Sequence, residues 1–166
     1  ITLDRLDLVA TDVHANAGDI LDGNGTVTAD TLVGTASLPL NQVAALLGAQ
    51  MLASPAADGA QITISPGPNG DIQAEVKVDV PGVSLDLIAT GKIAVSDGKI
   101  KFDVDSLKPK DGSSSPLLDA VLSQVRQTLA VPLELPALPY GLVITDATAD
   151  SSGLDVTAKA TNVQLS

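Results

Sequence analysis

The chain has 166 residues and a formal net charge of −11, with 45% hydrophobic and 17% charged residues. This length and composition predict a single folded domain with a substantial core, not a disordered tail. The acidic charge argues against nucleic acid as a partner, because binding it needs clustered Lys and Arg side chains to neutralise phosphates. The absence of cysteine excludes disulfides and thiolate-bound metals.

Aromatic residues are nearly absent, since Phe102 and Tyr140 are the only two and there is no Trp. Any apolar interior is therefore built from Val, Leu, Ile and Ala. Such a lining is branched and offers few stacking faces. It suits acyl chains better than bases or sugar rings, which usually need aromatic platforms.

The beginning of the chain predicts two strands. Apolar and polar residues alternate in residues 1–10 and 26–38, but each alternation changes phase partway along. A shift by one residue moves every following side chain to the opposite face, so we expect a bulge or a strand crossing between layers in each. His14 is the only histidine, and it is predicted to lie in a surface turn after the first strand.

The middle of the chain predicts a helix and then a sheet. Residues 40–52 have apolar residues at helical spacing. Residues 61–106 then read as a meander of four strands. Its clearest member is 71–80, where every apolar residue alternates with a polar one, so that one face is buried and the other solvated.

The last third predicts an amphipathic helix over 116–130, a run of prolines among leucines over 131–140, and two long strands over 141–165. Ser115 and Pro116 supply the cap and first turn of that helix. The pattern in 154–165 again changes phase. Together these elements predict an α+β fold in which a long, strongly bent antiparallel sheet wraps around amphipathic helices.

No catalytic constellation is predicted. A Ser-His-Asp triad would have to include His14, and there is no G-x-S-x-G sequence. Residues 22–26 (DGNGT) are similar to a calcium loop but lack the third acidic ligand and the distal Glu. We therefore expect no enzyme activity, no metal and no cofactor.

Three segments resemble the LmeA-like phospholipid-binding family of actinobacterial envelope proteins. They are 131–144 (VPLELPALPYGLVI), 153–165 (GLDVTAKATNVQL) and, less sharply, 34–48 (GTASLPLNQVAALLG). The resemblance implies a tubular lipid-binding-like fold, with acyl chains held between a bent sheet and a helix. It also implies an exported protein of the periplasm or cell envelope, and some members are linked to assembly of mannose-bearing glycolipids. Members carry an N-terminal segment that is not recognisable here, so we expect a single lipid-binding-like domain that lacks it.

The expected ligand is phospholipid, with a membrane surface as a second contact and no prediction of oligomeric state. Periodicity assigns the chain-lining positions to the helix stripes and the inward strand residues. These are Leu40, Val43, Leu47, Leu85, Leu87, Phe102, Leu118, Val121, Leu122, Val125 and Leu129. A shallow basic rim at Lys99 and Lys101 is predicted to select the headgroup.

Two other functions remain open. The second hypothesis is a β-rich structural or interaction module with a filled core that docks onto an envelope partner, and co-purified lipid would separate it from the first. The third is a hydrolase acting on a lipid or glycan, which His14→Ala would test. If Val125 lines a cavity, Val125→Asp should abolish lipid uptake with little loss of fold, whereas unfolding would place it in a filled core.

Overall fold

The computed structural model describes residues 5–165 apart from 24, 53–59, 81, 131, 134 and 136. The elements in chain order are β1 (Arg5–Ala15), α1 (Ala17–Leu21), β2 (Val27–Leu38), α2 (Leu40–Leu52), β3 (Gln61–Pro66), η2 (Pro68–Gly70), β4 (Ile72–Val80), β5 (Val83–Ser96), β6 (Lys99–Pro109), α3 (Pro116–Leu129), η3 (Pro139–Gly141), β7 (Val143–Ala149) and β8 (Leu154–Gln164). Both long helices and all four strands of the predicted meander are confirmed.

The strands form two antiparallel sheets of four strands each. Sheet A has the order β1-β2-β8-β7, and sheet B has the order β3-β4-β5-β6. The α+β class is confirmed, but two sheets replace the one long sheet expected from the sequence. The reason is topological, because sheet B is a local meander from the middle of the chain, whereas sheet A joins strands from its two ends.

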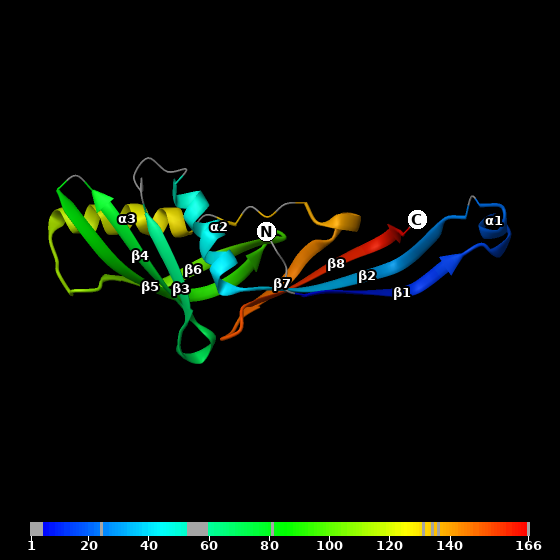
Figure 1. Cartoon of the computed structure of the whole chain (residues 1–166), viewed down its shortest axis with the longest axis horizontal. Helices are drawn as coiled ribbons and strands as arrows, with labels where there is room; N and C mark the ends of the chain where they lie inside the picture. Colours follow the sequence, from blue (N-terminus) through cyan, green and yellow to red (C-terminus); the bar gives the residue numbers. More distant parts are fainter. Residues whose placement is uncertain are drawn as a thin grey trace.

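The molecule is elongated, with sheet B, α2 and α3 at one end and sheet A at the other (Figure 1). Helix α2 packs on β3 and helix α3 packs on β6. The largest fully buried side chains of this end are Phe102, Leu47, Ile72, Leu87, Ile100, Leu129, Val43, Val76 and Val78. Burial of apolar side chains against the two helices is thus what stabilises sheet B.

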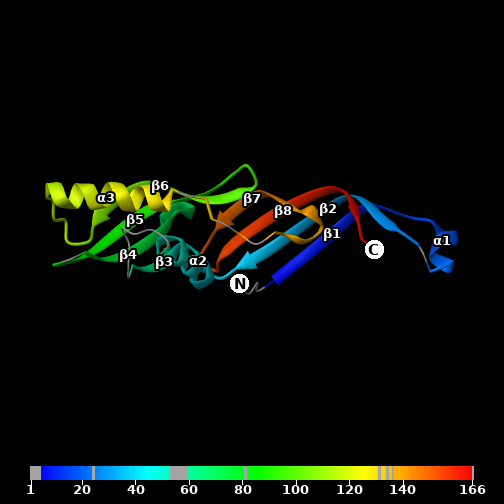
Figure 2. The same ribbon diagram turned by 90° about the horizontal axis from the view of Figure 1, so that it is seen from above.

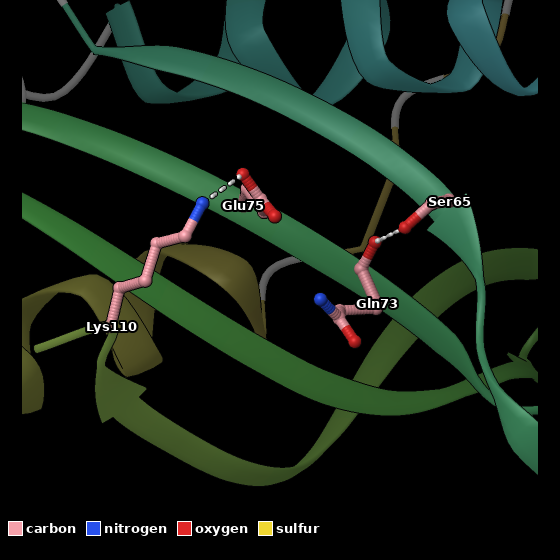
Figure 3. Close-up of polar contacts among 4 residues, drawn as sticks. All are labelled: Ser65, Gln73, Glu75 and Lys110. Carbon is pink, nitrogen blue, oxygen red and sulfur yellow. Dashed lines mark hydrogen bonds and ion pairs between the residues drawn. The ribbon is translucent and has the colours of Figure 1, made fainter. Parts of the chain in front are cut away.

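The solvated face of sheet B is held by polar contacts between neighbouring segments (Figure 3). Lys110 Nζ lies 3.2 Å from Glu75 Oε2, and the Ser65 hydroxyl donates to the backbone oxygen of Gln73 at 3.5 Å. These contacts are exposed or half-buried, so they contribute little stability individually. The alternation predicted for residues 71–80 is confirmed, because Ile72, Ala74, Val76 and Val78 are buried and the intervening residues are not.

The predicted changes of phase occur in β2 and β8. Residues three apart lie on opposite faces of a regular strand, yet Ala29 and Leu32 are both buried, and so are Ala160 and Val163. Pairing keeps the same register on both sides of Asp30, so no residue is inserted there. Instead Asn162, which lies opposite Asp30, has a φ of 53°. This left-handed residue moves the side chains that follow it in β8 to the opposite face of the sheet.

Strand β1 differs from its prediction. It extends to Ala15, so His14 lies within a strand and not in a turn, although it is exposed as expected. Its Nε2 lies 3.4 Å from Oδ1 of Asp30 on the neighbouring β2. The phase change predicted in residues 1–10 depends on residues 1–4, which lie outside the described residues.

Helix α3 begins as its sequence predicts. The Ser115 hydroxyl accepts a hydrogen bond from the backbone N–H of Leu118 at 3.2 Å, and Pro116 occupies the first turn. The helix buries Leu118, Val125 and Leu129. None of the helices among the described residues is long and apolar enough to cross a membrane.

The segment after α3, of which the structure describes residues 132, 133, 135 and 137–142, connects the two ends of the molecule, and we call these residues the proline segment. Its start is held on sheet B, where the backbone N–H of Leu133 donates to the oxygen of Ile100 at 2.6 Å. Its end is the η3 turn, where Tyr140 has a φ of 58° and Gly141 a φ of 67°. From there β7 enters sheet A. Seen from above, the segment runs from the end of α3 across sheet A (Figure 2).

Candidate apolar binding groove

One face of sheet A is apolar across all four strands. The pairing aligns Leu8, Gly34, Ala158 and Ile144 in one row, and Leu6, Ala36, Val156 and Ala147 in the next. Alternation places the polar residues of these strands, such as Asp155 and Lys159, on the opposite face. An apolar sheet face of this kind needs a cover, yet α2 and α3 lie on the other sheet.

The proline segment covers part of this face and leaves a groove with a volume of about 240 Å³ beneath it. All twelve residues that line the groove are apolar. They are Leu6, Gly34, Ala36, Leu38, Leu135, Ala137, Leu138, Pro139, Leu142, Ile144, Val156 and Ala158. We call this the apolar groove.

The floor of the groove is formed by small residues of β2 and β8, namely Gly34, Ala36 and Ala158. A Cβ atom at Gly34 would lie 3.1 Å from Leu8 Cδ2 and 3.3 Å from Leu142 Cδ1. Gly34 therefore lets β2 and the proline segment approach closely at this point. Ala36 and Ala158 beside it are the next smallest side chains, so the floor of the groove is low between the larger Leu and Val walls.

The groove is open on the side of β1. This strand forms one edge of sheet A, and every residue of it is exposed. Leu6 lines the groove although it is 49% exposed, and its neighbour Leu8 is 42% exposed. A row of exposed leucines beside an apolar groove marks a place where an apolar ligand could enter.

A second cavity of about 440 Å³ adjoins the groove. Both are lined by Leu135, Ala137, Leu138, Leu142 and Ile144, so the proline segment is their common wall. The second cavity differs because it is also lined by Asp97 and Gly98, which form the turn between β5 and β6, and by Lys99, the first residue of β6. The two cavities together thus have a wholly apolar part and a part that includes charged residues.

The residues predicted to line a lipid site lie elsewhere. Most of them are buried in the core of the other end of the molecule: Val43, Leu47, Leu87, Phe102, Leu118, Val125 and Leu129. The remainder are half-buried and pack against that core: Leu40, Leu85, Val121 and Leu122. None of the eleven is among the residues that line the groove. Their contact with lipid stays a prediction.

The groove was missed by periodicity, but the sequence carried a signal for it. Eleven of its twelve lining residues fall within the segments 34–48, 131–144 and 153–165, which carry the family resemblance, and only Leu6 does not. Periodicity ranks positions by regular spacing, so it finds helix stripes and passes over a proline-rich segment.

Titratable groups with shifted pKa values lie in turns away from the groove. The Ser152 hydroxyl and backbone N–H, followed by the backbone N–H of Gly153, lower the pKa of Asp150. The Ser113 hydroxyl and backbone N–H do the same for the pKa of Asp111. Among the described residues no group of three or more His, Cys, Asp or Glu side chains could hold a metal ion. Asn24 of the calcium-like stretch 22–26 lies outside them.

The fold and the groove define a small α+β protein with a partly covered apolar cleft, of the kind that accommodates apolar ligands. The sequence profile of the LmeA-like phospholipid-binding family matches residues 1–159. The chain therefore belongs to the LmeA-like phospholipid-binding family, as its C-terminal segments predicted. No curated protein matches the chain significantly.

Proposed function

We propose that the protein binds phospholipid without catalysing a reaction on it, with an acyl chain lying in the apolar groove. The observation that supports this proposal is the wholly apolar lining of the groove, drawn from the segments that carry the family resemblance. Such a lining offers dispersion contacts and excludes water, and it supplies no acid, base or nucleophile.

The size of the groove sets how much of a chain it holds. If a methylene group takes ~30 Å³, the volume of a water molecule in the liquid, a groove of about 240 Å³ holds roughly eight methylenes. At ~0.8 kcal/mol per buried methylene, this contributes about 6 kcal/mol. The groove thus accounts for about half of a 16-carbon chain, and the remainder would lie along the open side at β1 or in the second cavity.

We further propose that the protein is exported and acts in the periplasm or cell envelope, as a carrier that supports glycolipid assembly. Membership of the family is the support for this role. Fractionation of the native host tests the location, because recovery of the protein with cytoplasmic markers would contradict it.

The first experiment is mass spectrometry of organic extracts from protein purified without detergent, before and after incubation with liposomes. A stoichiometric phospholipid is expected. An extract free of lipid in both cases would reject lipid binding and favour the filled-core interaction module.

A pair of variants locates the lipid. Ala36 is half-buried and lines the groove, whereas its neighbour Thr35 is exposed on the opposite face of β2. Ala36→Phe fills the groove with about six carbon atoms, which displace roughly five methylenes and should lower affinity by about three orders of magnitude. Thr35→Phe adds the same ring outside the groove and should leave binding unchanged. Equal lipid retention by both variants would place the chain elsewhere.

A further inference from the structure

One cationic and one anionic residue line the second cavity, and a single glycine separates them in the sequence. Asp97 and Lys99 both line it, on either side of Gly98. Within the described part of the chain neither makes an ion pair, whereas Lys92 and Lys110 pair with Asp71 and Glu75. The two charges are therefore available to a ligand.

The turn that carries these charges is fixed against both sheets. Gly98 has a φ of 72°, and a Cβ atom there would lie 2.7 Å from Val143 Cγ1, so the turn packs closely on the start of β7. One residue beyond Lys99, the oxygen of Ile100 accepts the hydrogen bond from Leu133 that holds the proline segment. The charges are thus positioned where the wall of the apolar groove begins, and they do not sit on a free hairpin.

We propose that this turn binds the headgroup of a zwitterionic phospholipid that carries a primary amine, of the phosphatidylethanolamine class. The Lys99 ammonium contacts the lipid phosphate, and the Asp97 carboxylate accepts hydrogen bonds from the lipid ammonium. The proposal rests on the proposed function, because it assumes that the attached acyl chain occupies the adjoining apolar groove.

Charge and composition favour this class over other headgroups. An anionic headgroup such as phosphatidylglycerol would satisfy Lys99 through its phosphate but bring no ammonium to Asp97, so the charge of that carboxylate would stay unpaired on a protein whose formal net charge is already −11. A quaternary choline group has no N–H to donate and is usually held by aromatic rings. Neither Phe102 nor Tyr140, the only aromatic residues of the chain, lines either cavity.

The test compares binding of the whole chain to vesicles of phosphatidylcholine doped equally with phosphatidylethanolamine or phosphatidylglycerol, read by lipid extraction and mass spectrometry. Exposed charge pairs are weak, so we expect a preference for the ethanolamine lipid of about two- to five-fold over each of the other two. Asp97→Asn is the informative variant. Asn tolerates the φ of 53° at this position, so the turn is kept while the negative charge is lost.

Asp97→Asn should abolish the preference for phosphatidylethanolamine by raising binding of phosphatidylglycerol. Unfolding of the variant cannot produce such a gain in binding. Lys99→Gln should lower binding of the host lipid and of both dopants, because all three carry the phosphate that Lys99 contacts. Lys108→Gln and Asp103→Asn are the controls, because they make the same charge changes on β6 at residues that do not line the second cavity. A wild-type protein without headgroup preference, or controls that shift it equally, would overturn the proposal.

Two further outcomes separate this proposal from its premise. If the wild-type chain retains no lipid from any vesicle, the proposed function itself fails. Free phosphoethanolamine is expected not to compete at concentrations where the lipid binds, because it lacks the acyl chain. Competition at equal concentration would overturn the lipid assignment in favour of a soluble phosphoamine.

Discussion

The substitution Val125→Ala in α3 tests whether the helix end of the molecule holds lipid or a filled core. Its side chain is 3% exposed and belongs to the main hydrophobic cluster. Val125→Ala removes two methyl groups, which costs about 1.6 kcal/mol of transfer free energy and about 1 kcal/mol for the cavity left behind. The better helix propensity of Ala returns roughly 0.6 kcal/mol. The net loss of stability is therefore about 2 kcal/mol, or about 6 °C in Tm for a chain of this length.

The assay for Val125→Ala is thermal unfolding together with lipid retention from liposomes. Gln124→Ala is the matched control, because Gln124 is the exposed neighbour in the same helix and should change Tm by less than about 2 °C. We expect Val125→Ala to lower Tm while retaining lipid. An unchanged Tm with loss of lipid would refute the placement of the acyl chain in the apolar groove and support the sequence-based prediction that Val125 contacts it.

Two further predictions concern the backbone and the turns. Gly91→Ala should destabilise the β5–β6 pair strongly, because its Cβ would overlap the backbone oxygen of Asp103 at a bulge. Gly48→Ala in α2 is its control and should be neutral or slightly stabilising in urea denaturation, since nothing lies within 4 Å of a Cβ there. Asp150 has a pKa lowered from 3.8 by hydrogen bonds, chiefly from Ser152. Its stabilising contribution is therefore complete above its ordinary pKa and is lost as pH falls through the lowered value. Asp150→Asn removes that contribution, so the urea midpoints of wild type and variant should converge as the pH is lowered. A difference between the two midpoints that stays constant with pH would contradict this prediction.

Much of the secondary structure follows from local sequence. Helices α2 and α3 and the strands of sheet B have regular apolar spacing, and their bounds lie within three residues of the prediction. The cap at Ser115 follows from hydroxyl chemistry within one turn. His14 was misplaced because β1 continues past its apolar alternation, held by pairing with β2 and not by its own burial pattern.

The sequence by itself determined the elements, their apolar composition and the family, because each depends on residues close together in the chain. Only the tertiary structure decided that strands from the two ends of the chain share sheet A, since β2 pairs with β8 across more than a hundred residues. That pairing places Gly34 beside Ala158 and brings the proline segment over both. The apolar groove exists because of this long-range register, which no local periodicity encodes. The apolar stripes of α2 and α3 pack into the hydrophobic cluster on sheet B, a placement that only the tertiary structure shows, and their contact with lipid stays a prediction.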